Sequence, residues 1–159
     1  MTTISHNKPQ AAPQVAGRGL VIHEDRLLLV NGDGDGTFWV PPGGRANLGE
    51  DIKACVKREV YEETGLQVSV GAMIAVSEYF DEAADFHILQ AHFLCTIESG
   101  TLSDNWVDHH GPVRHARFYT LEEMKGLPRV FPSFLLEGGW QNFKDHGLYK
   151  GFERRDIQV

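Results

Sequence analysis

A cluster of acidic residues beside one arginine is the part of this chain best suited to chemistry. Glu59 follows directly after Arg58, and Glu62 and Glu63 come after two intervening residues. On a helix with about 100° of rotation per residue, Glu59 and Glu63 fall on the same side as the apolar residues of the stretch. Unpaired carboxylates near a core are costly, and carboxylates so close together repel each other. The pattern favours a cation held by oxygen ligands, with Mg²⁺ the best fit and a buried salt-bridge network as the alternative.

A helix has to hold these carboxylates, and the sequence marks both of its ends. Asp51 is a residue type that caps helix N-termini, and Gly65 is a residue type that ends helices. Between them, apolar side chains recur at helical spacing at Ile52, Cys55, Val56 and Val60. The sequence therefore predicts a helix between Asp51 and Gly65 with its apolar face toward a sheet.

The spacing around this helix resembles a known family motif. From Gly44, five residues lead to Glu50, seven more lead to Arg58-Glu59-Val60, and Tyr61-Glu62-Glu63-Thr64-Gly65-Leu66 follows. These residues match every fixed position of the Nudix box, G-x5-E-x7-R-E-U-x-E-E-x-G-U, in which U is a bulky aliphatic residue. The preceding Trp39–Gly43 is similar to the usual lead-in of that family.

The resemblance implies a hydrolase that cuts a phosphoric anhydride bond with the help of carboxylate-bound cations. It assigns Mg²⁺ binding to Glu59, Glu62 and Glu63, with Mn²⁺ as a substitute and the backbone of Gly44 as a further contributor. The cations would neutralise developing charge and lower the pKa of the attacking water. Arg58 is interpreted as an orienting partner for a neighbouring glutamate, with an ordinary surface cation as the alternative.

Three residues outside the acidic cluster are candidates for substrate binding. Arg18 resembles the basic residue that many members of the family direct at substrate phosphates, although an ordinary exposed arginine is equally compatible with the sequence. Trp39 is a candidate for stacking on a base, with core packing as the alternative. Glu50 is similar to the first glutamate of the box, which assists the site less than the helix carboxylates do.

The identity of the general base stays open at this point. Many members of the family place an acid or a histidine in a loop well after the box, and the matching region of this chain offers Asp108, His109 and His110. We take His110 as the candidate because an imidazole can accept a proton from water near neutral pH. Two adjacent surface histidines without a catalytic role are the alternative.

The substrate class follows from the resemblance only in outline. We expect a nucleoside diphosphate linked to another group, such as ADP-ribose or a nucleotide sugar. The alternatives are pyrophosphohydrolysis of a (deoxy)nucleoside triphosphate and a non-catalytic regulatory module that binds nucleotides. Aromatic residues that could line a base pocket, or else pack in the core, are Tyr79, Phe80, Trp106 and Phe131.

Length, charge and cysteine content limit the remaining function classes. The 159 residues fit a flexible segment over residues 1–15 followed by one domain over residues 16–159. The net charge of −7 disfavours nucleic acid and anionic membranes as partners. Without an apparent signal or spanning segment, a cytoplasmic location is the default expectation. Cys55 and Cys95 lie in apolar segments and are expected as buried thiols, and homodimers are common in the family that the box resembles.

The order of expected elements indicates an α+β domain, in agreement with the α/β/α sandwich and mixed β-sheet that the resemblance implies. Thr120 opens a capping pattern for a short helix over Leu121–Met124. The sequences of Phe131–Leu136 and Trp140–Phe143 are compatible with a second helix, although Gly138 and Gly139 interrupt it. The expected strands cover Gly19–Ile22, Arg26–Val30, Phe38–Val40, Leu66–Val76, Ser77–Phe80, Phe86–Ile97 and Val113–Tyr119.

Overall fold

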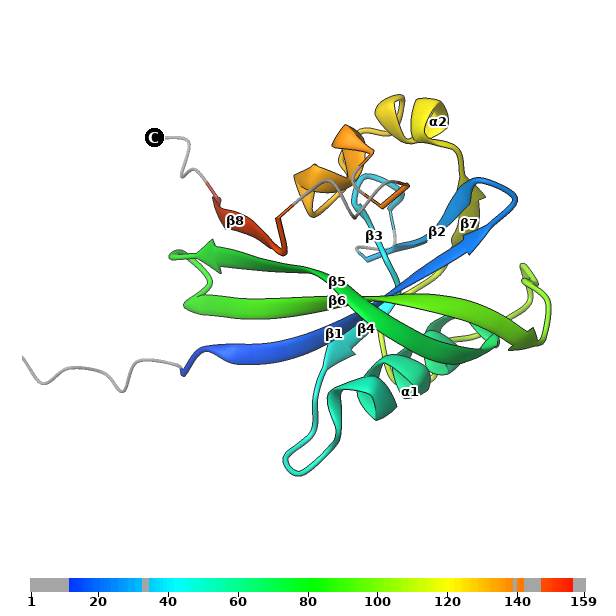
Figure 1. Cartoon of the computed structure of the whole chain (residues 1–159), viewed down its shortest axis with the longest axis horizontal. Helices are drawn as coiled ribbons and strands as arrows, with labels where there is room; N and C mark the ends of the chain where they lie inside the picture. Colours follow the sequence, from blue (N-terminus) through cyan, green and yellow to red (C-terminus); the bar gives the residue numbers. More distant parts are fainter. Residues whose placement is uncertain (1–11, 33–34, 139, 142–146, 156–159) are drawn as a thin grey trace, which may run out of the picture.

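The computed structural model describes residues 12–32, 35–138, 140–141 and 147–155, which form a mixed β-sheet with helices on both faces (Figure 1). Within these residues the sheet has eight strands, in the order β3-β2-β1-β6-β5-β8, with β4 paired to β1 and β7 paired to β2. The strands are β1 (Gln14–His23), β2 (Arg26–Asn31), β3 (Trp39–Val40), β4 (Gly43–Arg45), β5 (Gln67–Asp81), β6 (Phe86–Ser99), β7 (Ala116–Tyr119) and β8 (Tyr149–Arg154). This arrangement confirms the expected α+β sandwich.

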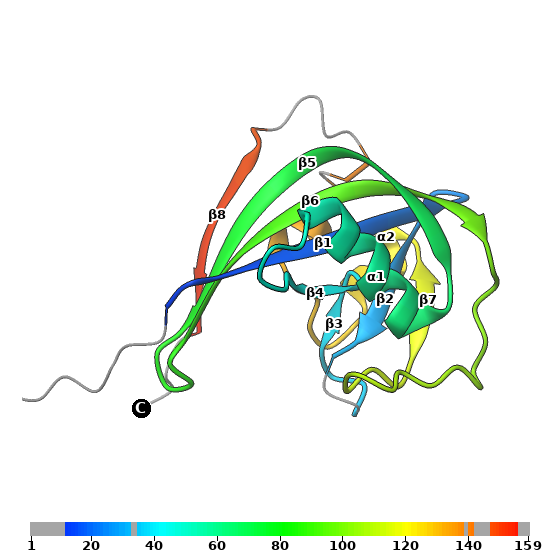
Figure 2. The ribbon, with the colours of Figure 1, turned by 90° about the horizontal axis from the view of Figure 1, so that it is seen from below.

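The central strands are buried on both faces, which explains their runs of consecutive apolar residues, such as Leu27–Val30 of β2. Leu20 of β1 packs in one cluster with Met124, whereas the next residue, Val21, packs with Val56 and Val60 on the opposite face. Helix α1 (Ile52–Thr64) covers the second face, while α2 (Leu121–Lys125) and the 3₁₀ helix η1 (Ser133–Glu137) lie beyond the first (Figure 2). The alternation of side chains along each strand thus builds two core layers.

Helix α1 begins and ends where the sequence predicts. The Asp51 carboxylate accepts hydrogen bonds from the backbone N–H groups of Lys53 and Ala54, and Gly65 adopts a left-handed conformation with φ of 75°. The capping box of α2 is also present, with Thr120 and Glu123 each bonding the other's backbone N–H. Local capping chemistry therefore sets the ends of these helices.

Several strand boundaries differ from expectation. Strand β1 begins at Gln14, so the sheet includes the last residues of the segment expected to be flexible, and residues 1–11 lie outside the described chain. Strand β5 is one long strand instead of two, and register shifts around Met73 let it bend against β6. Strand β4 was not expected because glycines favour turns in isolated sequence, yet here they pair with β1.

The C-terminal expectations were partly wrong. Ser133–Glu137 forms a short 3₁₀ helix, which Gly138 ends with a positive φ of 74°, so the residues described up to Gly138 form no long second helix. The end of the expected segment, Phe143, lies outside the described residues. Strand β8 was missed, since its pairing with β5 is a long-range parallel contact that leaves little local signal.

The expectation that both cysteines are buried thiols is confirmed. Cys55 and Cys95 are both buried free thiols. In the described part of the chain, no helix is both long enough and apolar enough to cross a membrane.

Replacing Gly17 with alanine should destabilise the fold. An added Cβ would lie 2.6 Å from Val56 Cγ2 and 3.1 Å from the Ile52 carbonyl oxygen, so α1 would have to move away from β1. We expect the free energy of unfolding, measured in urea, to fall by about 1–3 kcal/mol. Gly147→Ala is the matched control, because an added Cβ there meets nothing within 4 Å. Equal stability of both variants would contradict this packing account.

Candidate active site

Two glycines of β4 allow the carboxylates of α1 to approach the sheet. The Glu59 carboxylate lies so close to Gly44 that an added Cβ would come within 2.6 Å of it. The backbone N–H of Gly43 donates to Glu63 Oε2 at 2.9 Å. Gly43 has a φ of 153° and no room for a side chain against Gly17 and Arg18 of β1. The Gly43-Gly44 pair is therefore a steric requirement of the site.

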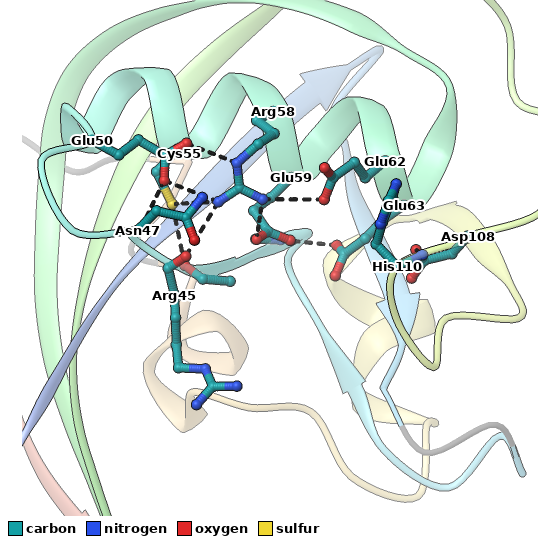
Figure 3. Close-up of polar contacts among 12 residues, drawn as sticks. Arg45, Asn47, Glu50, Cys55, Arg58, Glu59, Glu62, Glu63, Asp108 and His110 are labelled. Carbon is teal, nitrogen blue, oxygen red and sulfur yellow. Dashed lines mark hydrogen bonds and ion pairs between the residues drawn. The ribbon is translucent and has the colours of Figure 1, made fainter.

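Arg58 joins three carboxylates on one side of α1 (Figure 3). Its Nε donates to Glu50 Oε1 at 2.7 Å, and its Nη1 donates to Glu59 Oε1 at 2.7 Å and to Glu62 Oε2 at 3.1 Å. Its Nη2 donates to Glu50 Oε2 at 3.0 Å and to the Arg45 carbonyl oxygen at 3.2 Å. The contact expected between Arg58 and one neighbouring glutamate is present, and it extends to two further glutamates.

Glu63 has an unusual electrostatic environment for a carboxylate. Loss of hydration raises the pKa of its carboxyl group to about 8, although the positive charge of Arg18 and the Gly43 N–H both act in the opposite direction. Glu59 and Asp108 add negative charge nearby and raise the pKa further. Burial is therefore the main reason that the charged form of Glu63 is disfavoured, and the neighbouring acids add to it.

The donor set fits a hard divalent cation. Glu59, Glu62 and Glu63 offer carboxylate oxygens, the ligands that Mg²⁺ prefers, and burial of Glu63 disfavours a charged carboxylate that no cation binds. Among the described residues, no three acidic, imidazole or thiol side chains already converge on one point. The reason is that Glu59 and Glu62 extend toward Arg58.

The loop between β6 and β7 brings Asp108 and His110 to the carboxylates (Figure 3). Trp106 fixes this loop on α1: its Nε1 donates to the Glu62 carbonyl oxygen at 2.9 Å, and its ring contacts Tyr61 edge-on with centroids 5.5 Å apart. Asp108 is buried and accepts backbone N–H groups of the loop, whereas the exposed His110 lines the cavity over the acids. His109 does not line it.

Two cavities adjoin at Arg18. The acidic cavity, of about 520 Å³, contains the carboxylates and His110. The aromatic cavity, of about 690 Å³, is lined by Phe38, Tyr79, Phe86 and Phe131 among others. Arg18 lines both cavities, and its guanidinium donates to Gln90 Oε1 at 2.7 Å and to the Gly43 carbonyl oxygen at 2.9 Å.

The structure corrects two of the expected substrate contacts. Trp39 is buried in the core, where its Nε1 donates to the Gly36 carbonyl oxygen and its ring meets Tyr119 edge-on, so it has no free face for a base. Glu50 lines neither cavity described above, because Arg58 and the Asn47 N–H occupy its oxygens. Neither residue lines the acidic or the aromatic cavity.

Other aromatic residues also separate into two groups. Tyr79 and Phe131 line the aromatic cavity, as one expectation had it. Phe80 stacks with Phe152, and Trp106 holds the loop between β6 and β7 on α1. Sequence reasoning missed Gln90, whose signal is a polar residue between the apolar Leu89 and Ala91 of β6.

Removing the charge of Glu50 should affect stability in a pH-dependent way. Its hydrogen bonds with Arg58, and then with the Asn47 N–H, lower the pKa of Glu50 from 4.5 to about 2. A depressed pKa in the folded state stabilises the fold above pH 4.5, and this contribution disappears as the pH falls toward 2. Glu50→Gln should therefore lower the melting temperature at pH 7, with a smaller difference from wild type at pH 3. A difference that does not vary with pH would contradict this role of the ion pair.

Comparisons with known proteins agree with this geometry. Residues 13–134 match the model of the NUDIX domain. A mouse protein, nucleoside diphosphate-linked moiety X motif 6, is 26% identical over 145 residues, which cover 91% of this chain and 43% of the relative. The ADP-ribose pyrophosphatase of Methanocaldococcus jannaschii is 28% identical over 118 residues, covering 72% of this chain and 66% of the relative. This chain therefore spans less than half of the mouse relative.

Solved structures with the same fold include a UDP-X diphosphatase, with a TM-score of 0.67 and 21% identity over 90% of this chain and 68% of the other. A NUDIX hydrolase from Nitrosomonas europaea has a TM-score of 0.68 and 19% identity, covering 87% of this chain and 93% of the other. At this level of identity the structures support the fold alone. Together with the match to the domain model over most of its length, they show that the chain belongs to the Nudix family.

Proposed function

We propose that this protein hydrolyses the pyrophosphate bond of a nucleoside diphosphate linked to another group, such as ADP-ribose or a nucleotide sugar, in a Mg²⁺-dependent reaction. The observation that carries the proposal is the junction at Arg18 between the acidic cavity and the aromatic cavity. A substrate with a charged diphosphate and a flat base matches this pair of environments. The names of the ADP-ribose pyrophosphatase and the UDP-X diphosphatase above point in the same direction.

Glu59, Glu62 and Glu63, with the backbone of Gly44, would hold Mg²⁺, and Mn²⁺ would substitute for it. The bound ion supplies positive charge to the phosphate oxygens and lowers the pKa of the attacking water. Arg58 keeps Glu59 and Glu62 oriented through the hydrogen bonds described above. Arg18 is held between two cavities and would contact the diphosphate with its guanidinium.

His110 would accept the proton of the attacking water. Its side chain lines the acidic cavity and is exposed there, whereas both Asp108 oxygens already accept backbone N–H groups. As the proton moves to His110, the water oxygen forms a bond to one phosphorus, and the bond from that phosphorus to the bridging oxygen breaks. The products are two compounds that each carry a phosphate group.

A substrate panel tests the proposal directly. With Mg²⁺ present, we expect turnover of ADP-ribose, nucleotide sugars or related compounds, and at least about a 100-fold loss of kcat in Glu63→Gln. Glu122→Gln is the matched control, because Glu122 is an exposed residue of α2 that lines neither cavity. Turnover confined to nucleoside triphosphates would refute the substrate class, and undiminished activity of Glu63→Gln would refute the assigned site.

Replacement of His110 tests the proton acceptor separately. His110→Ala should lower kcat by about 100-fold or more while leaving KM for the substrate nearly unchanged, since general base catalysis contributes this much. His109→Ala serves as control, because His109 is the neighbouring imidazole that does not line the acidic cavity. If the two variants retain the same activity, the base is another group.

A further inference from the structure

A third cavity, which we call the distal cavity, adjoins the acidic cavity. It has a volume of about 520 Å³, and the residues of its wall that matter here are Gln14, Val15, Arg45, Asn47, Leu48 and Glu59. It shares Arg45, Asn47 and Glu59 with the acidic cavity. The aromatic cavity instead shares Arg18 and Phe38 with the acidic cavity. The acidic cavity therefore has two separate neighbours, which have no lining residue in common.

Hydrogen bonds fix the walls of the distal cavity. The Ala46 N–H donates to the Val15 carbonyl oxygen at 3.0 Å, so the start of β1 lies beside the end of β4. The Asn47 N–H donates to Glu50 Oε2 at 2.8 Å, and the Glu50 N–H donates back to the Asn47 carbonyl oxygen at 3.0 Å. Arg58 binds the same Glu50 carboxylate. Glu50 thus fixes the loop that carries Asn47 without lining the cavity itself.

Arg45 places a positive charge where the acidic and distal cavities meet. Its side chain is exposed and extends away from α1 (Figure 3). The hydrogen bond of its guanidinium goes to the neutral Gln14 Oε1 at 3.4 Å. Within the described ranges of the chain, no carboxylate forms an ion pair with Arg45. A guanidinium of this kind is suited to bind a phosphate oxygen.

The amide side chains of the wall suit hydroxyl groups. Gln14 and Asn47 each carry a carbonyl acceptor and an NH₂ donor, which match the two hydrogen-bonding functions of a sugar hydroxyl. Among the described residues, no aromatic side chain lines the distal cavity, in contrast to the aromatic cavity. A flat base would therefore find no ring to stack on. These walls fit a phosphorylated sugar better than a second nucleoside.

We propose that the distal cavity binds the group linked to the nucleoside diphosphate, and that this group is a sugar. Arg45 contacts the phosphate on the sugar side, and Gln14 and Asn47 contact the sugar hydroxyls. The proposal rests on the proposed function, because it takes the diphosphate to lie in the acidic cavity. It makes that function more specific: ADP-ribose or a nucleotide sugar occupies all three cavities, whereas a dinucleotide would bring its second base to a wall without aromatic rings.

The test uses the two halves of ADP-ribose, AMP and ribose 5-phosphate, as separate ligands. Neither half contains an anhydride bond, so binding can be measured with Mg²⁺ present and without turnover. In NMR titrations, ribose 5-phosphate should shift the backbone amide signals of Val15 and Leu48, which line only the distal cavity of the three. AMP should instead shift the signals of Tyr79 and Phe131 in the aromatic cavity. Inorganic phosphate should leave Val15 and Leu48 unchanged, because it has no sugar to place beside them.

A substitution at Gln14 tests the sugar contact. Gln14→Leu removes the amide at similar side-chain size, so it should weaken ribose 5-phosphate binding about fivefold, the effect of one neutral hydrogen bond, and leave AMP binding unchanged. Gln67→Leu is the matched control, because Gln67 is exposed at the start of β5 and lines none of the three cavities. Melting temperatures of both variants verify folding.

The outcomes separate this proposal from the proposed function. No binding of ribose 5-phosphate, shifts confined to the residues that AMP or phosphate shifts, or unchanged affinity in Gln14→Leu would overturn the distal site, even if ADP-ribose is hydrolysed. If ribose 5-phosphate binds in the distal cavity but neither ADP-ribose nor a nucleotide sugar is turned over, the proposed hydrolysis fails and the sugar phosphate site stands.

Discussion

The site depends on positive charges that compensate the carboxylates of α1, because this helix packs them against the sheet. Glu59 and Glu63 have to lie beside β4, since the same helix face supplies the Val56 and Val60 side chains to the core. In the described structure Arg58 supplies one compensating charge, and Arg18 acts on Glu63 from β1. Burial raises the pKa of Glu63, and the negative charges of Glu59 and Asp108 add to this effect. A divalent cation bound by these carboxylates would stabilise their charged forms, which is the physical basis of the proposed metal site.

Strand β1 places Arg18 where the acidic cavity and the aromatic cavity meet. It pairs with β4 on one side, which places Arg18 opposite Gly43, and with β6 on the other, which brings Arg18 to Gln90. One side chain therefore lies between the charged and the aromatic cavity, with its guanidinium fixed by backbone oxygens. Under the proposed function, the positions of the diphosphate and of the base would be linked through the strands of the sheet.

Local chemistry made part of this arrangement predictable from sequence. The caps at Asp51 and Gly65 and the apolar spacing of α1 are local signals, and the structure confirms the helix that they predict. Trp39 and Glu50 line neither of the two cavities. Trp39 packs against Tyr119, a long-range contact that leaves no local signal, and Glu50 is paired with Arg58. Strand β8 and the contact between Arg18 and Gln90 were also missed, since both arise from long-range pairing across the sheet.

The most direct test of this account is whether the α1 carboxylates bind a divalent cation. Binding of Mn²⁺, followed by electron paramagnetic resonance with Mg²⁺ as competitor, should weaken at least about tenfold in Glu59→Gln and Glu63→Gln, since each loses a charged ligand. Glu98→Gln, at an exposed position on β6, should bind as wild type does. Unchanged Mn²⁺ affinity in both α1 variants would contradict the account and leave Arg58 and Arg18 as the only counter-charges that the described structure gives these carboxylates.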